Sequence, residues 1–225
     1  MKEKYKLFLS VIRALDKAGA LDQIILIGSW SQFLYRDYFQ NSPHIPAIRT
    51  LDVDFLVPQP SKAGKDIDIS KILEKCGFEI NSSYPEGYSK FSNPELEIEF
   101  LTPELGKDNG SHCNIKNLHV QAQKMRYLDI LQEHVLKVTY EHIEVKVPEP
   151  SAFVIQKILG TEYRKNSGKK QKDLDAAKEI GEYLLEDPVQ RKKLKTIFDS
   201  LPVKWGKRLR KIIQHKSQPL FEYLK

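Results

Sequence analysis

The stretch that decides the fold is RTLDVDFLV at residues 49–57. Its β-branched and aromatic side chains predict a strand, which Pro58 ends. Successive side chains of a strand point to opposite faces, so Asp52 and Asp54 share one face. The opposite face carries the apolar side chains Leu51, Val53 and Phe55. The pattern therefore predicts a core strand with one acidic face.

A core strand that bears two acids needs a cation. Two nearby carboxylates repel each other, and one pKa rises unless positive charge lies between them. Mg²⁺ binds carboxylate oxygens and keeps coordination positions free for substrate phosphates. We therefore expect Asp52 and Asp54 to hold Mg²⁺, with Mn²⁺ as the alternative ion. The competing interpretation is a solvated edge strand, because a pattern as short as Asp-x-Asp also arises by chance.

The segment before this strand predicts a phosphate site. Residues 24–27, IILI, form a short apolar strand, Gly28-Ser29 interrupts it, and residues 30–39 have helical periodicity. Such a turn directs free backbone N–H groups and the positive end of a helix toward one point, which favours phosphate. Glycine allows a close approach to the backbone, and Ser29 adds a hydroxyl donor. The alternative is a turn that binds nothing.

A second acidic strand follows. Residues 96–103, LEIEFLTP, echo residues 51–58, LDVDFLVP. We interpret the two as neighbouring strands with their acids on the same face, and not as an internal repeat. Either Glu97 or Glu99 would then complete the metal site or accept the proton of an attacking hydroxyl group. The alternative is a glutamate that faces solvent or pairs across the sheet.

The remaining pattern predicts a mixed front part and a helical back part. Helices are expected at 3–18 and 67–76, strands at 78–80, 89–92, 136–140 and 143–147, and loops at 41–46, 59–66 and 103–118. From Phe153 onward the periodicity is helical, with breaks near 166–168, 187–188 and 201–202. We therefore predict an α+β fold, with a mixed sheet flanked by helices in residues 1–147 and an all-α domain in residues 148–225.

Charge is distributed unevenly between these two parts. The chain of 225 residues has a formal net charge of +6, yet residues 1–147 hold 18 Lys and Arg against 20 Asp and Glu. Residues 148–225 hold 18 against 10. An acidic-leaning part suits metal ions, and a basic part suits polyanions such as RNA. Trp205 in the basic tail would stack on a base or, alternatively, join Leu209 and Ile213 in the buried stripe of a helix.

With Gly28-Ser29, Asp52-x-Asp54 and Glu99, the chain resembles the DNA polymerase β-like nucleotidyltransferase superfamily. The resemblance implies a mixed sheet flanked by helices, and transfer of a nucleoside monophosphate from an NTP with Mg²⁺. It implies that Asp52, Asp54 and Glu99 bind the metal, and that Gly28 and Ser29 hold phosphates. Glu99 stands where the superfamily usually has Asp. That departure leaves open a non-catalytic module that keeps the fold and binds nucleotide or RNA.

The basic part resembles the abortive-infection-type branch, which includes toxin nucleotidyltransferases. The resemblance is carried by Lys157, Arg164 and the Lys172-Asp173 pair. It implies that Lys157 is catalytic, and that Lys157, Lys172 and Asp173 contribute to nucleotide binding. It also implies an acceptor such as RNA (tRNA included), a protein or a small molecule, and an antitoxin protein as partner. The alternative for either lysine is a solvated surface side chain.

Other features bear on location. No apolar run is long enough to span a bilayer, and the first residues lack the pattern of a secretory signal. Cys76 and Cys113 form no CxxC pair and no disulfide framework. We therefore expect a cytoplasmic protein with reduced thiols and no membrane partner.

Overall fold

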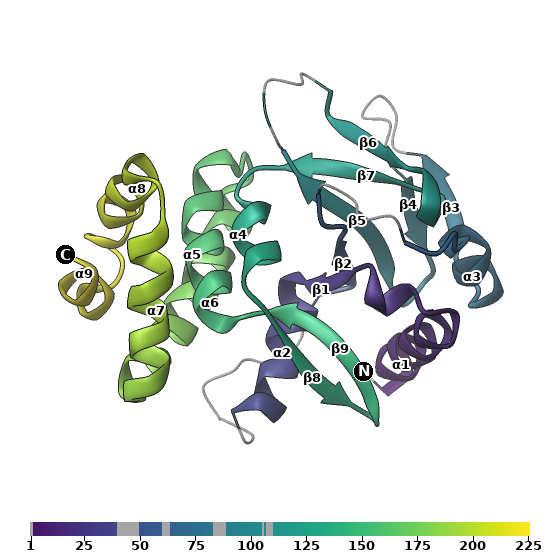
Figure 1. The fold of residues 1–225 in the computed structure, drawn as a ribbon, viewed down its shortest axis with the longest axis horizontal. Coiled ribbons are helices and arrows are strands. Elements are labelled where there is room, and N and C mark those ends of the chain that lie inside the picture. The colour runs from purple at the N-terminus through teal and green to yellow at the C-terminus, as the bar shows by residue number, and fades with distance from the viewer. Residues whose placement is uncertain (1, 40–49, 60–63, 83–88, 105, 107–109) are drawn as a thin grey trace.

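The computed structural model describes residues 2–39, 50–59, 64–82, 89–104, 106 and 110–225 (Figure 1). The predicted loop at 41–46, the position of Arg49 and part of the predicted loop at 59–66 lie outside these residues. Within them, the chain forms a mixed sheet flanked by helices and followed by further helices, as the sequence predicts.

The main sheet is built around two parallel strands. β2 (Asp52–Leu56) lies beside β5 (Glu97–Pro103) in parallel, and β1 (Ile25–Ile27) pairs antiparallel with the other edge of β2. On the far side of β5, β4 (Ser89–Ser92) and then β3 (Glu79–Ser82) continue the sheet in antiparallel order. The prediction that the two acidic strands are neighbours is confirmed.

Strand β5 has two different partners along one edge. Its first half pairs with β4, and its second half pairs in parallel with β7 (Val120–Met125), which in turn pairs with β6 (His112–Ile115). The predicted loop at 103–118 is therefore wrong at its end, where β6 and the 3₁₀ turn η2 (Lys116–Leu118) form. β6 is polar and largely exposed, so apolar alternation could not reveal it; its backbone pairing with β7 holds it.

Helices and a hairpin cover the sheet. α1 (Lys2–Ala18) buries the predicted apolar stripe, and Phe8 stacks on Trp30 with ring centroids 3.9 Å apart. α2 (Gly28–Tyr38) begins two residues earlier than predicted, and α3 (Ile69–Lys75) is capped by Asp68. The 3₁₀ turn η1 (Ala20–Asp22) leads into β1. β8 (Val135–Tyr140) and β9 (Ile143–Pro148) form a separate hairpin, and β9 packs beside β1.

From Pro150 onward the chain is helical. The helices are α5 (Pro150–Gly160), the short turn η3 (Thr161–Tyr163), α6 (Ser167–Glu186), α7 (Pro188–Ser200), α8 (Val203–Ile213) and α9 (Gln218–Leu224). Asn166 and Asp187 cap α6 and α7 at two of the predicted breaks, and Pro202 precedes α8 at the third. Ser217 caps α9, whose start was not predicted. α5 is buried along most of its length because it packs against α4 (Leu128–Glu133), α6, α7 and α8.

The change from strands to helices falls just after Val147, where the sequence predicts a boundary. That residues 1–147 and 148–225 are separate domains stays a prediction. Among the described residues, no helix combines the length and apolar character needed to cross a membrane. The cytoplasmic location stays a prediction.

Candidate active site

The acids of β2 open onto a cavity of about 460 Å³. Along β2, Val53 and Phe55 are fully buried, whereas Asp52 and Asp54 are only partly buried and line the cavity. The predicted alternation is therefore confirmed for the strand itself. Leu51 departs from it, because it precedes β2 and is 48% exposed. The side of the cavity formed by Asp52 and Asp54 of β2, Lys90 of β4 and Glu99 of β5 is called the sheet wall.

Strand β5 adds two more acids to the same face. Asp52 lies opposite Glu97, and Asp54 lies opposite Glu99, in a parallel register. Lys90 on β4 reaches both glutamates, with its Nζ 2.6 Å from Glu97 Oε2 and 3.0 Å from Glu99 Oε1. Burial lowers the pKa of Lys90, but its hydrogen bonds to the two glutamates outweigh this effect, so the pKa lies above its usual value. Lys90 therefore stays protonated.

Asp54 and Gly28 fit together closely. β1 pairs with β2 so that Ile27 lies opposite Asp54, which places the following Gly28 against the carboxylate. Gly28 has a φ of 69°, and a Cβ atom added there would lie 2.3 Å from Asp54 Oδ2. Only glycine allows both this backbone conformation and this contact. The first turn of α2, with Gly28 and Ser29 lining the cavity, therefore lies directly beside an acid.

The opposite side of the cavity is basic. It is formed by Lys157, Arg164, Lys169, Lys172 and Asp173 and is called the helical wall. Lys157 on α5 and Arg164 after η3 both pair with Asp173 on α6, at Nζ–Oδ1 2.7 Å and Nε–Oδ2 2.9 Å. Burial raises the pKa of Asp173, but Lys157 and Arg164 outweigh it, so the pKa lies below its usual range. Lys172 also lines the cavity. The structure thus brings together every residue that the sequence predicts for the site.

The two walls interact across the cavity. Burial raises the pKa of Asp54 to about 6, the charges of Glu99 and Asp52 add to this rise, and Lys157 and Arg164 oppose it. A carboxyl group with this pKa is still mostly ionised at pH 7, and a cation bound beside it would lower the pKa further. Asp52 accepts a hydrogen bond from Thr50 Oγ1 at 3.1 Å. Among the described residues, no Lys, Arg or His forms an ion pair with Asp52 or Asp54.

These two carboxylates fit a divalent cation. Mg²⁺ in phosphate-binding sites is typically held by one or two carboxylates, with phosphates and water completing its coordination. Asp52 and Asp54 provide oxygen ligands at the cavity, and Gly28 keeps the space beside Asp54 free of a side chain. In the parts of the chain that the structure describes, no group of three or more His, Cys, Asp or Glu side chains is arranged to hold a metal ion.

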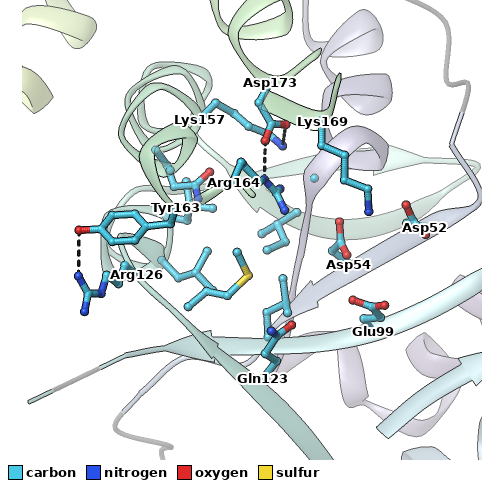
Figure 2. A pocket seen from close by; sticks show the side chains of 18 of the residues that line it. Asp52, Asp54, Glu99, Gln123, Arg126, Lys157, Tyr163, Arg164, Lys169 and Asp173 are labelled. Carbon is cyan, nitrogen blue, oxygen red and sulfur yellow. Dashed lines mark hydrogen bonds and ion pairs between the residues drawn. The ribbon is translucent and has the colours of Figure 1, made fainter. Parts of the chain in front are cut away.

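Sequence reasoning missed several cavity residues. Lys169 on α6 lines the cavity, and Figure 2 shows its side chain pointing toward Asp54. Nothing in the sequence distinguishes it from other lysines of the basic tail. Lys90 could have been found, because predicted strands at 89–92 and 96–101, joined by a short turn, pair so that Lys90 faces Glu99.

The far end of the cavity is aromatic and basic. Tyr163 is 46% exposed, and it accepts a hydrogen bond from Arg126 Nη1 at 2.8 Å (Figure 2). The Arg126 guanidinium also lies 4.7 Å from the centre of the Tyr163 ring. Arg208 on α8 donates to the hydroxyl groups of Tyr127 and Tyr163. Trp205 packs edge-on against Tyr127 with centroids 4.8 Å apart, so it contributes to packing, as one of its two interpretations predicts.

Comparison with known families agrees with this geometry. A family model described as a nucleotidyltransferase matches residues 6–200. The chain belongs to this nucleotidyltransferase family. The match spans both the acidic strands and the helices that carry Lys157 and Asp173, so both walls of the cavity fall inside it. The abortive-infection branch is not confirmed and stays a prediction.

A solved structure at low sequence identity shows a similar fold. An antigenic nucleotidyltransferase-like protein from Paracoccidioides brasiliensis matches with 15% identity and a TM-score of 0.51, over 97% of this chain and 91% of that chain. The antibiotic-resistance factor ANT(2'')-Ia matches with 10% identity over 88% of this chain and 92% of that chain, but its TM-score of 0.45 supports no argument. Curated protein sequences gave no significant match.

Proposed function

We propose that this nucleotidyltransferase uses a divalent cation, Mg²⁺ or Mn²⁺, to transfer a nucleoside monophosphate from an NTP to an acceptor. The observation that supports the proposal best is the pair Asp52 and Asp54, which have no ion-pair partner among the described residues and face a cavity lined by Lys157 and Lys169. An NTP with its metal ion carries the charges that such a cavity lacks: a cation for the acids and phosphates for the lysines.

The cavity offers separate places for the parts of an NTP. The phosphates would lie between the Gly28-Ser29 turn and the helical wall, where backbone N–H groups and lysine ammonium groups donate hydrogen bonds. Met125, Leu128 and Leu131 also line the cavity. The sugar and base would lie over these apolar side chains, with the base near the Tyr163 ring.

Asp52 and Asp54 would hold the metal ion, which stabilises the charge that develops on the phosphoryl oxygens during transfer. Lys157 and Lys172 would neutralise the triphosphate. Asp173 would position Lys157 and Arg164 and would not contact the nucleotide itself, since its two oxygens already pair with these cations. The Gly28 backbone would keep Asp54 from turning away from the cavity, because the two are in contact.

RNA is the acceptor that the surface charge favours. α8 carries Lys204, Lys207, Arg208, Arg210 and Lys211, and Arg208 reaches from this helix to Tyr163 at the end of the cavity. A cationic helix next to the cavity would attract an RNA backbone. A toxin-like role with an antitoxin partner has narrower support, namely the resemblance at Lys157, Arg164, Lys172 and Asp173.

Transfer of label from [α-³²P]NTPs to total RNA or to lysate protein, with Mg²⁺, tests the proposal. We expect labelled product with the wild type and none with Asp52→Ala/Asp54→Ala. Asp199→Ala is the matched control, because Asp199 is an acid on α7 that pairs only with Lys195 four residues before it. Label transfer that is absent in the wild type, or unchanged in the double variant, would contradict the proposal.

The alternative is a non-catalytic module that binds nucleotide or RNA, and the glutamate at position 99 with its Lys90 contact favours it. Calorimetry with each NTP, with and without Mg²⁺, separates the two: binding without any transfer supports the module. For the toxin-like role, expression in a bacterial host should arrest growth, and Asp52→Ala should relieve the arrest. Arrest that persists in the variant would exclude transfer as its cause.

A further inference from the structure

Four acids and one lysine lie on the face of the sheet that forms the sheet wall, and all but Glu97 line the cavity. Asp52, Asp54, Glu97 and Glu99 form two cross-strand pairs on one face of β2 and β5, whose strands lie roughly 4.8 Å apart. Four carboxylates this close repel one another strongly unless cations are distributed among them. The distribution of positive charge on this face therefore decides which acids remain available for a metal ion.

Lys90 neutralises only half of this face. It bridges Glu97 and Glu99 through two ion pairs, and β4 places it directly across from Glu99. The side chains of Lys90 and Glu99 are 30% and 19% exposed, so the contact is partly shielded from water. Charge-assisted hydrogen bonds of this length are stronger than neutral ones. Lys90 is thus committed to the β5 glutamates, and it also lines the cavity.

The other cations that line the cavity include Lys157 and Arg164, which have a partner elsewhere, and Lys169, whose side chain points toward Asp54 without forming an ion pair among the described residues (Figure 2). Lys157 and Arg164 both pair with Asp173 on the helical wall. On the sheet wall, Asp52 and Asp54 are left without an ion pair among the described residues. Two of the four acids therefore have their counter-ion built into the chain, and two do not.

We infer that Lys90 takes the place of a second divalent cation, so that the site binds one metal ion, on Asp52 and Asp54, with Glu99 held by Lys90 and not by metal. The inference rests on the proposed function for the identity of the ion, but it concerns how many ions the chain binds. A lysine ammonium is a compact point charge, so it can supply one of the two positive centres that flank a transferring phosphoryl group.

Counting Mn²⁺ bound to the full chain by electron paramagnetic resonance, without nucleotide, tests the inference. We expect one Mn²⁺ per wild-type chain. Glu99→Gln should change the affinity less than about threefold, whereas Asp54→Asn should weaken it by about 100-fold or more, because it removes a direct ligand. Wild-type protein that binds two ions, or Glu99→Gln that weakens binding as much as Asp54→Asn, would overturn the inference.

Two variants of Lys90 test whether its charge limits the number of bound Mn²⁺ ions. Lys90→Met frees the glutamates, so a second Mn²⁺ should bind, whereas Lys90→Arg keeps the charge and should still bind one. Lys137→Met is the matched control, because Lys137 forms a cross-strand ion pair with Glu144 on the separate β8–β9 hairpin. The Lys137→Met variant should bind one Mn²⁺ ion. Circular dichroism confirms that each variant folds; if Lys90→Met unfolds, a folded Lys90→Arg that binds two ions would overturn the inference.

The outcome is independent of NMP transfer. A wild type that binds one Mn²⁺ but transfers no label from any NTP would contradict the proposed function and leave the role of Lys90 intact. A wild type that transfers label and binds two ions would support the proposed function and contradict the inference about Lys90.

Discussion

On the sheet wall, Asp52 and Asp54 have no ion-pair partner among the described residues, whereas on the helical wall Lys157 and Arg164 share the carboxylate of Asp173. On the helical wall, the ion pairs with Asp173 hold Lys157 and Arg164 in place before any phosphate arrives, while the wall keeps a net positive charge. On the sheet wall, burial raises the pKa of Asp54, and the charges of Glu99 and Asp52 add to this rise. Under the proposed function, a bound cation would balance the acids, whereas Asp173 already balances part of the charge of the lysine and the arginine.

The first prediction tests the sheet wall by activity. Asp52→Asn and Asp54→Asn should each lower transfer by about 1000-fold or more, roughly 4 kcal/mol of transition-state stabilisation, because each would remove a charged ligand of the proposed metal ion. Glu97→Gln lies on the same face and should lower it less than about tenfold. Steady-state rates with labelled NTP measure all three. Equal losses in the three variants would show that the face acts as one unit.

The second prediction tests the helical wall by stability. Asp173→Asn leaves Lys157 and Arg164 without their shared carboxylate, so the free energy of unfolding should fall by about 3 kcal/mol. Asp175→Asn is the control, because Asp175 is exposed on the same helix and bonds only to Gln171. Urea denaturation measures the free energy of unfolding of both variants. Because the folded pKa of Asp173 lies below 3.8, its contribution exists above that pH and is lost as the pH falls through the folded value.

The third prediction concerns the pH dependence of the metal-free protein. The pKa of Asp54 is about 6 when folded and near 3.8 when unfolded, so the folded state holds its proton more tightly. Stability should therefore fall as the pH rises from about 4 to above 6, by roughly 2 to 3 kcal/mol at most. Asp54→Asn should flatten this fall, and so should Mn²⁺ in the wild type. Urea denaturation in EDTA at several pH values measures the free energy of unfolding of both proteins. If Asp54→Asn raises this free energy by the same amount at every pH, the prediction is wrong.

The fourth and smallest effect concerns Gly28. Gly28→Ala adds a Cβ in contact with Asp54 at a φ of 69°, so it should cost about 1–3 kcal/mol of stability and displace the acid. Gly19→Ala is the control, because Gly19 has a φ of 75° with nothing within 4 Å of its Cβ position. The Gly19→Ala variant should lose only the stability that the backbone strain costs. Both unfolding and Mn²⁺ binding should be measured, and only Gly28→Ala should weaken Mn²⁺ binding.

The sequence was sufficient to predict the acids of the sheet wall, because alternation along a strand fixes which side chains share a face. Asp52, Asp54, Glu97 and Glu99 lie as predicted for that reason. Lys157 and Asp173 came from a family resemblance, since a lysine on a helix has no periodic signal of its function. Lys169 and Arg126 were not predicted, because their position depends on how helices and loops pack around the cavity. Strand β6 was missed because its stability comes from backbone pairing and not from apolar side chains.

The order of the two walls along the chain has a consequence for synthesis at the ribosome. β1, β2 and β5 emerge first, whereas α5 and α6, which carry Lys157 and Asp173, emerge much later. A nascent chain would therefore present its acids before the facing cations exist. Catalytic competence would begin only after α6 has left the exit tunnel and packed on α5, so a partly made chain would be unable to act on its acceptor.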